Sequence, residues 1–107
     1  MNKYKKVLSL LGIAKKANKL YAGEFKTITS IRKRKSQLVL ISEDASENTK
    51  KKFVNSCKYY NTKYLFFGLK SDLGKSIGFS SPVSVLSIVD KKFSEVIIKE
   101  ILKENTN

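Results

Sequence analysis

Two adjacent carboxylates, Glu43 and Asp44, follow the apolar run Leu38–Ile41 and are the residues best suited to do chemistry. With Asp72 they could hold a magnesium ion or work as an acid–base pair, because hard cations prefer carboxylate oxygens. They could also only start a helix, since Asp44 or Ser46 can accept hydrogen bonds from the free N–H groups of a first turn. No dedicated metal motif surrounds them, so the capping interpretation is favoured over catalysis.

Other groups with catalytic potential are sparse. The chain has no histidine, which excludes histidine-based triads and imidazole metal sites. The single cysteine, Cys57, lies on an apolar stripe and is expected to be a buried thiol. Neither G-x-x-x-x-G-K-[ST] nor G-x-G-x-x-G occurs, and Gly74-Lys75-Ser76 lacks the first glycine of a phosphate loop. The sequence therefore predicts no catalytic residue, no metal and no cofactor, and it argues against an enzyme.

Positive charge is the strongest compositional signal. The 107 residues include 22 Lys and Arg against 9 Asp and Glu, a net charge of +13. Residues 1–35 hold 11 of the basic residues and a single acidic one, Glu24. Such a field attracts polyanions, so nucleic acid is the first candidate partner and an anionic membrane surface the second. No apolar run approaches the roughly 20 residues of a membrane span, and a lone cysteine fits a reducing compartment. A cytoplasmic protein without membrane insertion or a signal peptide is expected.

The elements that must position these groups alternate along the chain. Apolar residues recur every three or four positions in four segments, which predicts amphipathic helices. Short apolar runs over residues 19–23, 36–42, 63–68 and 81–90 predict strands, and those at 36–42 and 63–68 are expected to be buried on both faces. A short helix is predicted over 71–78, and Asn18 should close the first helix in the left-handed conformation. The helical stripes are Val7, Leu10, Leu11 and Ala14; Phe25, Ile28 and Ile31; Phe53, Val54, Cys57 and Tyr60; and Phe93, Val96, Ile97 and Ile101.

This order of helices and strands predicts the fold class. An αβαβαβαβα chain packs as one sheet with helices on both faces, a three-layer α/β/α sandwich. We expect one mixed sheet of about four strands in a single domain over residues 1–107, with no linker and no repeat, and a monomer.

Three stretches are distinctive in combination. They are L-G-x-A-x-x-A-x-K-L from Leu11 to Leu20, L-V-L-x-x-E-D-A-S-x-N-T-K-K-K from Leu38 to Lys52, and LGKSIGFSSPVSVLSI from Leu73 to Ile88. With Gly23 after the first strand, they resemble the YlxQ-type bacterial members of the kink-turn-binding ribosomal protein superfamily, over about residues 7–93. The resemblance implies an α/β/α sandwich in the cytoplasm that binds structured RNA, ribosomal RNA among the candidates, without catalysis.

In that superfamily three neighbouring loops form the RNA surface. The residues at the matching positions are Gly23, Glu24, Phe25, Lys26 and Thr29 in the first loop, Asp44 and Ser46 in the second, and Phe79 and Ser80 in the third, with Lys70 at a phosphate contact. The resemblance implies that Asp44 accepts from base amino groups and that Phe79 stacks on an extruded base, the alternative for Phe79 being a half-buried loop anchor.

The first loop departs from the superfamily's pattern. Phe25, Lys26 and Thr29 stand where its best RNA binders carry Asn, Glu and Lys, so the preferred RNA need not be a standard kink-turn. Phe25 either packs on the core face of its helix or stacks on a base.

Basic side chains near the first loop allow two interpretations. Arg32 and Lys33, with Arg34 and Lys35, are a solvated helix end, a clamp for RNA backbone flanking the first loop, or both. Lys19 is expected to extend the same patch. Three functions remain: a structured-RNA-binding module, a general polyanion or membrane-surface binder without a shaped site, and a small metal-dependent enzyme.

Overall fold

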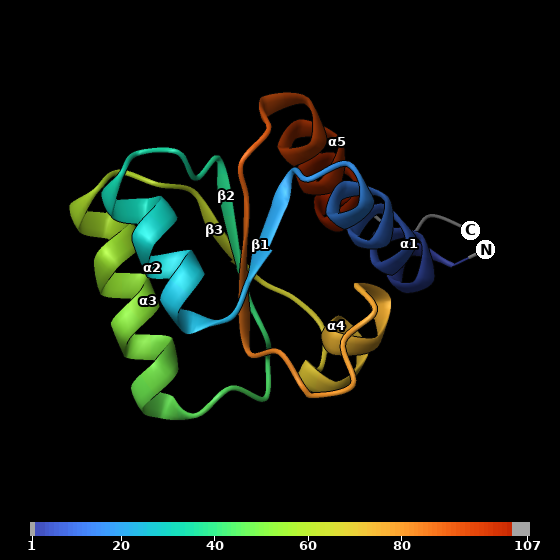
Figure 1. Cartoon of the computed structure of the whole chain (residues 1–107), viewed down its shortest axis with the longest axis horizontal. Coiled ribbons are helices and arrows are strands. Elements are labelled where there is room, and N and C mark those ends of the chain that lie inside the picture. The colour runs from blue at the N-terminus through green and yellow to red at the C-terminus, as the bar shows by residue number, and fades with distance from the viewer. Residues whose placement is uncertain (1, 104–107) are drawn as a thin grey trace.

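Helices and strands alternate through the whole of the computed structural model, which describes residues 2–103 (Figure 1). None of the helices in this range is long and apolar enough to cross a bilayer. The elements are α1 (Lys3–Lys16), β1 (Leu20–Ala22), α2 (Glu24–Arg32), β2 (Leu38–Ile41), α3 (Glu47–Tyr59), β3 (Tyr64–Phe66), α4 (Lys70–Ser76), β4 (Val85–Ile88) and α5 (Lys91–Leu102).

The four strands of residues 2–103 form one mixed sheet in the order β1-β4-β2-β3. β4 is antiparallel to both β1 and β2, whereas β2 and β3 are parallel. Helices α2 and α3 cover one face of the sheet, and α1, α4 and α5 lie on the other (Figure 1). The predicted α/β/α sandwich with a mixed four-stranded sheet is confirmed.

Each central strand contributes side chains to two hydrophobic cores, because successive side chains point to opposite faces of a sheet. In β2, Leu38 and Leu40 join the core under α1, α4 and α5, whereas Val39 and Ile41 join the core under α2 and α3. All four side chains are fully buried. The continuous apolar run therefore marks a strand covered on both sides, as predicted.

Polar residues fix the helix ends. Ser46 Oγ accepts the N–H of Thr49 at 3.1 Å and caps α3. Asp90 Oδ2 accepts the N–H of Phe93 at 2.8 Å and caps α5. Asn18, with φ of +59°, follows α1 in the left-handed conformation predicted for it.

Two predictions of burial, for β3 and for Val96, were wrong, and the structure decides between the two interpretations of Phe25. β3 lies at the edge of the sheet, and Phe66 at its end is 42% exposed, because β2 is its single strand neighbour. Phe25 is 80% exposed, since α2 begins at Glu24 and turns Ile28 and Ile31 toward the sheet instead. Val96 is 51% exposed on the outer side of α5. Strand order explains the exposure of Phe66 and the start of α2 explains that of Phe25, and composition encodes neither.

Cys57 should react very slowly with thiol reagents in the folded protein. Its side chain is fully buried on α3, and burial raises the pKa of the thiol to about 11. Because the thiolate is the reactive form, we expect labelling by a thiol reagent at pH 8 to be orders of magnitude slower in native protein than in denaturant. Stopped-flow labelling measures this, and equally fast reaction in both states would contradict the placement of α3.

Candidate functional site

Three loops and the start of β4 meet at one end of the sheet, beyond the last residues of β1, β2 and β3. β1, β2 and β3 all terminate at this end, and β4 begins there (Figure 1). The N–H of Gly23, at the β1–α2 turn, donates to the carbonyl oxygen of Val85 at 2.9 Å. The N–H of Glu43, after β2, donates to the carbonyl oxygen of Gly68, after β3, at 2.8 Å. We call this region, residues 23–26, 42–46, 67–70 and 78–82, the loop edge.

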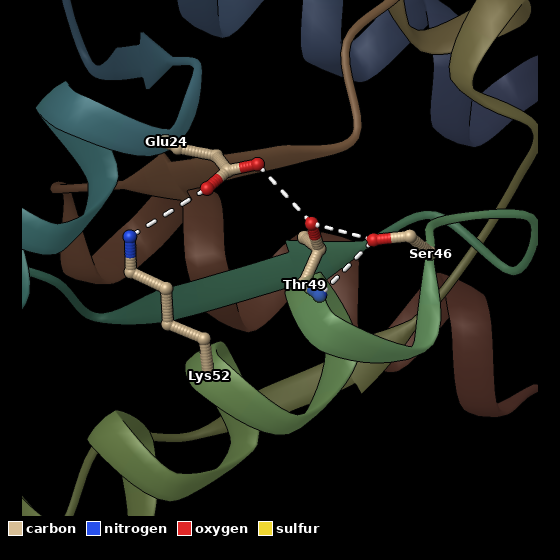
Figure 2. A network of polar contacts seen from close by, with 4 residues as sticks. All are labelled: Glu24, Ser46, Thr49 and Lys52. Atoms are coloured by element: carbon tan, nitrogen blue, oxygen red, sulfur yellow. Dashed lines mark hydrogen bonds and ion pairs between the residues drawn. The ribbon is translucent and has the colours of Figure 1, made fainter.

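A polar network joins the first two loops (Figure 2). Glu24 Oε2 accepts a hydrogen bond from Thr49 Oγ1 at 3.2 Å, and Lys52 Nζ lies 3.6 Å from Glu24 Oε1. Ser46 Oγ donates in turn to Thr49 Oγ1 at 3.0 Å. The start of α2 and the start of α3 are thus held together, and Lys52 offsets the charge of the carboxylate. Glu24 and Ser46, both predicted RNA contacts, belong to this one network, whereas Thr49 and Lys52 were not predicted.

Asp44 ties the second loop to α4. Its Oδ1 accepts the N–H of Lys70, the first residue of α4, at 2.9 Å. Of the two residues predicted as possible caps of α3, Asp44 and Ser46, it is Ser46 that caps the helix. The hydrogen bond from the backbone N–H of Lys70 is the main cause that holds the pKa of Asp44 below its usual value. Asp44 is therefore a cap for a helix that starts 26 residues further along the chain.

The Asp44 cap predicts a pH-dependent stability. Because its pKa is lower in the folded state, Asp44 stabilises the protein above the usual aspartate pKa of about 3.9, and this contribution is lost as the pH falls through the folded-state value. Asp44→Ala should lower Tm by a constant amount between pH 7 and 5, and the difference from wild type should vanish at more acidic pH. Thermal unfolding followed by circular dichroism measures both.

Glu43→Ala is the matched control for this prediction, because the Glu43 side chain makes no hydrogen bond within residues 2–103. A Tm difference for Asp44→Ala that persists unchanged to pH 2 would show that the carboxylate does not act as the cap.

The proposed magnesium ligands do not gather. Asp44 binds the start of α4, and Asp72 Oδ2 accepts the hydroxyl of Tyr4 at 2.6 Å. Within residues 2–103 no group of three acidic or cysteine side chains could hold a metal ion. The metal-dependent arrangement of Glu43, Asp44 and Asp72 is wrong for this part of the chain.

Gly23 leaves the start of α2 open. Its φ of +96° and ψ of 163° belong to a region that glycine alone adopts readily. A Cβ there would meet no atom within 4 Å, so the backbone conformation, rather than crowding within the protein, requires the glycine. No side chain caps α2. Within residues 2–103 the backbone N–H groups of Glu24, Phe25 and Lys26 have no hydrogen-bond acceptor, so the start of α2 is free to bind an anion.

The third loop is packed firmly onto α4. The N–H of Phe79 donates to the carbonyl oxygen of Gly74 at 2.9 Å, and a Cβ at Gly74 would collide with the carbonyl oxygen of Ser81. Phe79 is 40% exposed, and Lys15 Nζ of α1 lies 5.8 Å from the centre of its ring. Phe79 and the neighbouring Ser80 thus stand on the α1 side of the loop edge, on a fixed backbone.

Two groups of predicted residues lie away from the loop edge. Arg32 and Lys33 are at the other end of α2, about 12 Å along the helix at 1.5 Å per residue, and do not flank the first loop. Lys19 precedes β1 at the opposite edge of the sheet, where its Nζ lies 3.9 Å from Asp90 Oδ1. The length of α2 and the direction of β1 thus place Arg32, Lys33 and Lys19 away from the first loop, although all three are close to it in sequence.

The structure also adds residues that sequence reasoning missed. A hollow of about 220 Å³ runs along the outer side of α2 beside edge strand β1, and we call it the α2 hollow. The sequence signal that could have revealed this hollow is a pair of aromatic residues: Tyr21, in a short strand, lies four positions before Phe25. The hollow is lined by Tyr21, Phe25, Lys26, Thr29, Ser30, Lys33 and Lys35.

Comparison with known proteins decides the family. The model of the Ribosomal protein L7Ae/L30e/S12e/Gadd45 family matches residues 5–98. The chain belongs to this family. The RNA-binding protein YlxQ of Bacillus subtilis is 40% identical over 89 residues, which cover 83% of this chain and 88% of that protein. The large ribosomal subunit protein eL8 of Thermoplasma volcanium is 34% identical over 98 residues, 91% of this chain and 80% of that protein.

A solved structure shows the same L7Ae-family fold. A Bacillus halodurans protein described as of unknown function superposes with a TM-score of 0.86 at 33% identity, covering 92% of this chain and 98% of that one. The named relatives are RNA-binding and ribosomal proteins rather than enzymes, which confirms the prediction of a non-catalytic protein. The predicted resemblance to YlxQ-type proteins is confirmed as well.

Proposed function

We propose that this L7Ae-family chain binds structured RNA at the loop edge, as a single domain over residues 1–107 and as a monomer in the cytoplasm. The observation that carries the proposal is the open, uncapped start of α2 at Gly23, next to two other loops that are hydrogen-bonded into a fixed shape. A net charge of +13 supplies the attraction to phosphates. The relative named RNA-binding protein YlxQ, of which the match covers 88%, supports the same function.

Each part of the loop edge has a defined task in this proposal. The first-turn N–H groups of α2 and the side chain of Lys70 bind phosphates, while Asp44 and Ser46 offer acceptors to base amino groups and Phe79 offers a ring for stacking. All of the proposed contacts are at least partly exposed. They are Gly23, Glu24, Phe25, Lys26, Thr29, Asp44, Ser46, Lys70, Phe79 and Ser80, with Arg32 and Lys33 as an extension along α2.

The bound RNA is a folded element of ribosomal RNA or a kink-turn-like bend. Phe25, Lys26 and Thr29 stand on the exposed side of α2. They present an aromatic ring, a cation and a hydroxyl to the RNA, so selectivity for a standard kink-turn is not required by this proposal.

A direct comparison of RNAs tests the proposal. Dissociation constants are measured for a kink-turn RNA, a ribosomal RNA fragment and a poly-pyrimidine strand of equal length between 50 and about 300 mM salt. A shaped site predicts tighter binding of at least one folded RNA at every salt concentration. Equal affinities and equal salt slopes for all three would leave the general polyanion binder, which the high net charge favours.

The cations at the end of α2 should act without regard to RNA shape. The double variant Arg32→Gln/Lys33→Gln is expected to weaken binding of all three RNAs by similar factors. The slope of log affinity against log salt should become shallower by about 0.9 for each phosphate of a double helix that is no longer neutralised, and by about 0.7 for each phosphate of a single strand. The charge-matched control is Lys91→Gln/Lys92→Gln, on two exposed lysines at the start of α5. Equal effects of the two double variants would show that α2 has no special part in binding.

A further inference from the structure

The α2 hollow combines aromatic walls with positive charge. Tyr21 reaches it from β1 and is 41% exposed, and Phe25 reaches it from the first turn of α2 and is 80% exposed. Lys26, Lys33 and Lys35 line the same hollow, and no carboxylate does. Its ligand should therefore have a flat, apolar part and negative charge.

The two rings of the hollow are free, unlike the other exposed rings of the described chain. Phe79 lies under Lys15 and Phe66 lies under Lys50, with the Nζ atoms 5.8 and 5.9 Å from the ring centres. Tyr59 packs edge-on against Tyr60. Within residues 2–103, Tyr21 and Phe25 have neither an aromatic nor a cationic partner. An exposed ring without a partner offers a face on which a base can stack.

The lysines of the hollow are free as well. Lys26, Lys33 and Lys35 form no ion pair with a carboxylate of residues 2–103, whereas Lys52, on neighbouring α3, is paired with Glu24. Three unpaired cations around two free rings match the chemistry of a nucleotide, which has one planar base and one phosphate. A hollow of about 220 Å³ is smaller than the ~300–1,000 Å³ typical of sites for drug-sized ligands, so it suits one base rather than a large cofactor.

We infer that the α2 hollow holds an unpaired nucleotide of the bound RNA, with the base against Tyr21 and Phe25 and its flanking phosphates on Lys33 and Lys35. This inference rests on the proposed function, because the same RNA occupies the loop edge. The two sites are continuous through Phe25 and Lys26, which lie at the start of α2. The protein thus reads a folded element together with a single-stranded segment beside it.

The test compares three forms of one folded RNA, a kink-turn with blunt ends. The first is blunt, the second carries three unpaired adenines at the 5′ or the 3′ end, and the third carries abasic nucleotides in their place. Wild type should bind one of the adenine-extended RNAs at least about fivefold more tightly than the blunt and abasic forms, the lower limit for one base stacked on an aromatic ring.

Tyr21→Ala should abolish this preference and leave the affinity for the blunt RNA unchanged, because Tyr21 lies outside the loop edge. Tyr21→Phe, which keeps the ring, should retain the preference, and Lys35→Gln should reduce it. Tyr59→Ala removes a ring on α3 that is 81% exposed, more than the 41% of Tyr21, and should have no effect. Failure of wild type to prefer either adenine extension, or a preference that survives Tyr21→Ala, would overturn the inference. If neither the blunt kink-turn nor a blunt-ended ribosomal RNA fragment binds, the result counts instead against the proposed function.

Discussion

Phe79→Ala is expected to lower the affinity for a folded RNA that carries an extruded base by about 5- to 150-fold. That range corresponds to the ~1–3 kcal/mol contributed by one base stacked on an aromatic ring. The ring is 40% exposed and its backbone is fixed by the hydrogen bond from its N–H to Gly74, so little ordering is needed on binding. Affinity for a poly-pyrimidine strand should change far less, because the substitution removes no charge. Fluorescence anisotropy titrations with both RNAs measure the difference.

Phe66→Ala is the matched control for Phe79. The two rings are 42% and 40% exposed, and each lies under a lysine, Lys50 or Lys15. Phe66, however, shares its hollow with Glu43 as well as Lys50, so this hollow has no net positive charge to attract phosphates. Its removal should leave RNA binding within about twofold of wild type, well below one stacked base. Equal effects of the two variants, or no effect of Phe79→Ala, would show that Phe79 does not stack on a base of the RNA.

Gly74→Ala is expected to cost about 1–3 kcal/mol of folding free energy, the usual range for forcing extra atoms into a packed site. Gly74 is buried in α4, and a Cβ would collide with the backbone carbonyl of Ser81. Because backbone cannot rotate out of the way, the loop that carries Phe79 must shift. We therefore expect a decrease in affinity for folded RNA that is larger than the decrease in stability explains at temperatures where the variant is folded.

Urea unfolding and RNA titration of the same samples separate these two effects. Ser71→Ala, at an exposed position of the same helix, is the control and should change neither quantity. A Gly74→Ala variant with wild-type stability and wild-type affinity would show that α4 and the third loop are not closely packed.

The sequence predicted the central part of the sheet and failed at its edge. The run at β2 is apolar at every position because both faces are covered, and its burial is complete. The run at β3 looks equally apolar, yet it lies at the edge, because strand order depends on contacts between segments far apart in the chain. For Phe25 the sequence left core packing and base stacking open, and core packing is excluded because α2 begins at Glu24 and turns Phe25 away from the sheet.

Long-range hydrogen bonds explain what sequence reasoning missed at the candidate site. The capping role of the acidic pair was predicted, but the helix that Asp44 caps starts 26 residues later, at Lys70. Likewise Glu24, the one acidic residue among residues 1–35, binds Thr49 and Lys52 of another helix. The loops themselves were located by resemblance to a family, whereas basic residues assigned from charge alone fell at the opposite end of α2.

Mapping of backbone amides by NMR during titration with a kink-turn RNA tests the central claim, that the loop edge is the RNA-binding surface. Shift changes should concentrate at residues 23–26, 44–46 and 78–80, extend weakly along α2, and leave the start of α5 and residues 58–63 unaffected. Changes centred on the opposite edge of the sheet, or spread evenly over the lysine-rich surface, would contradict the account.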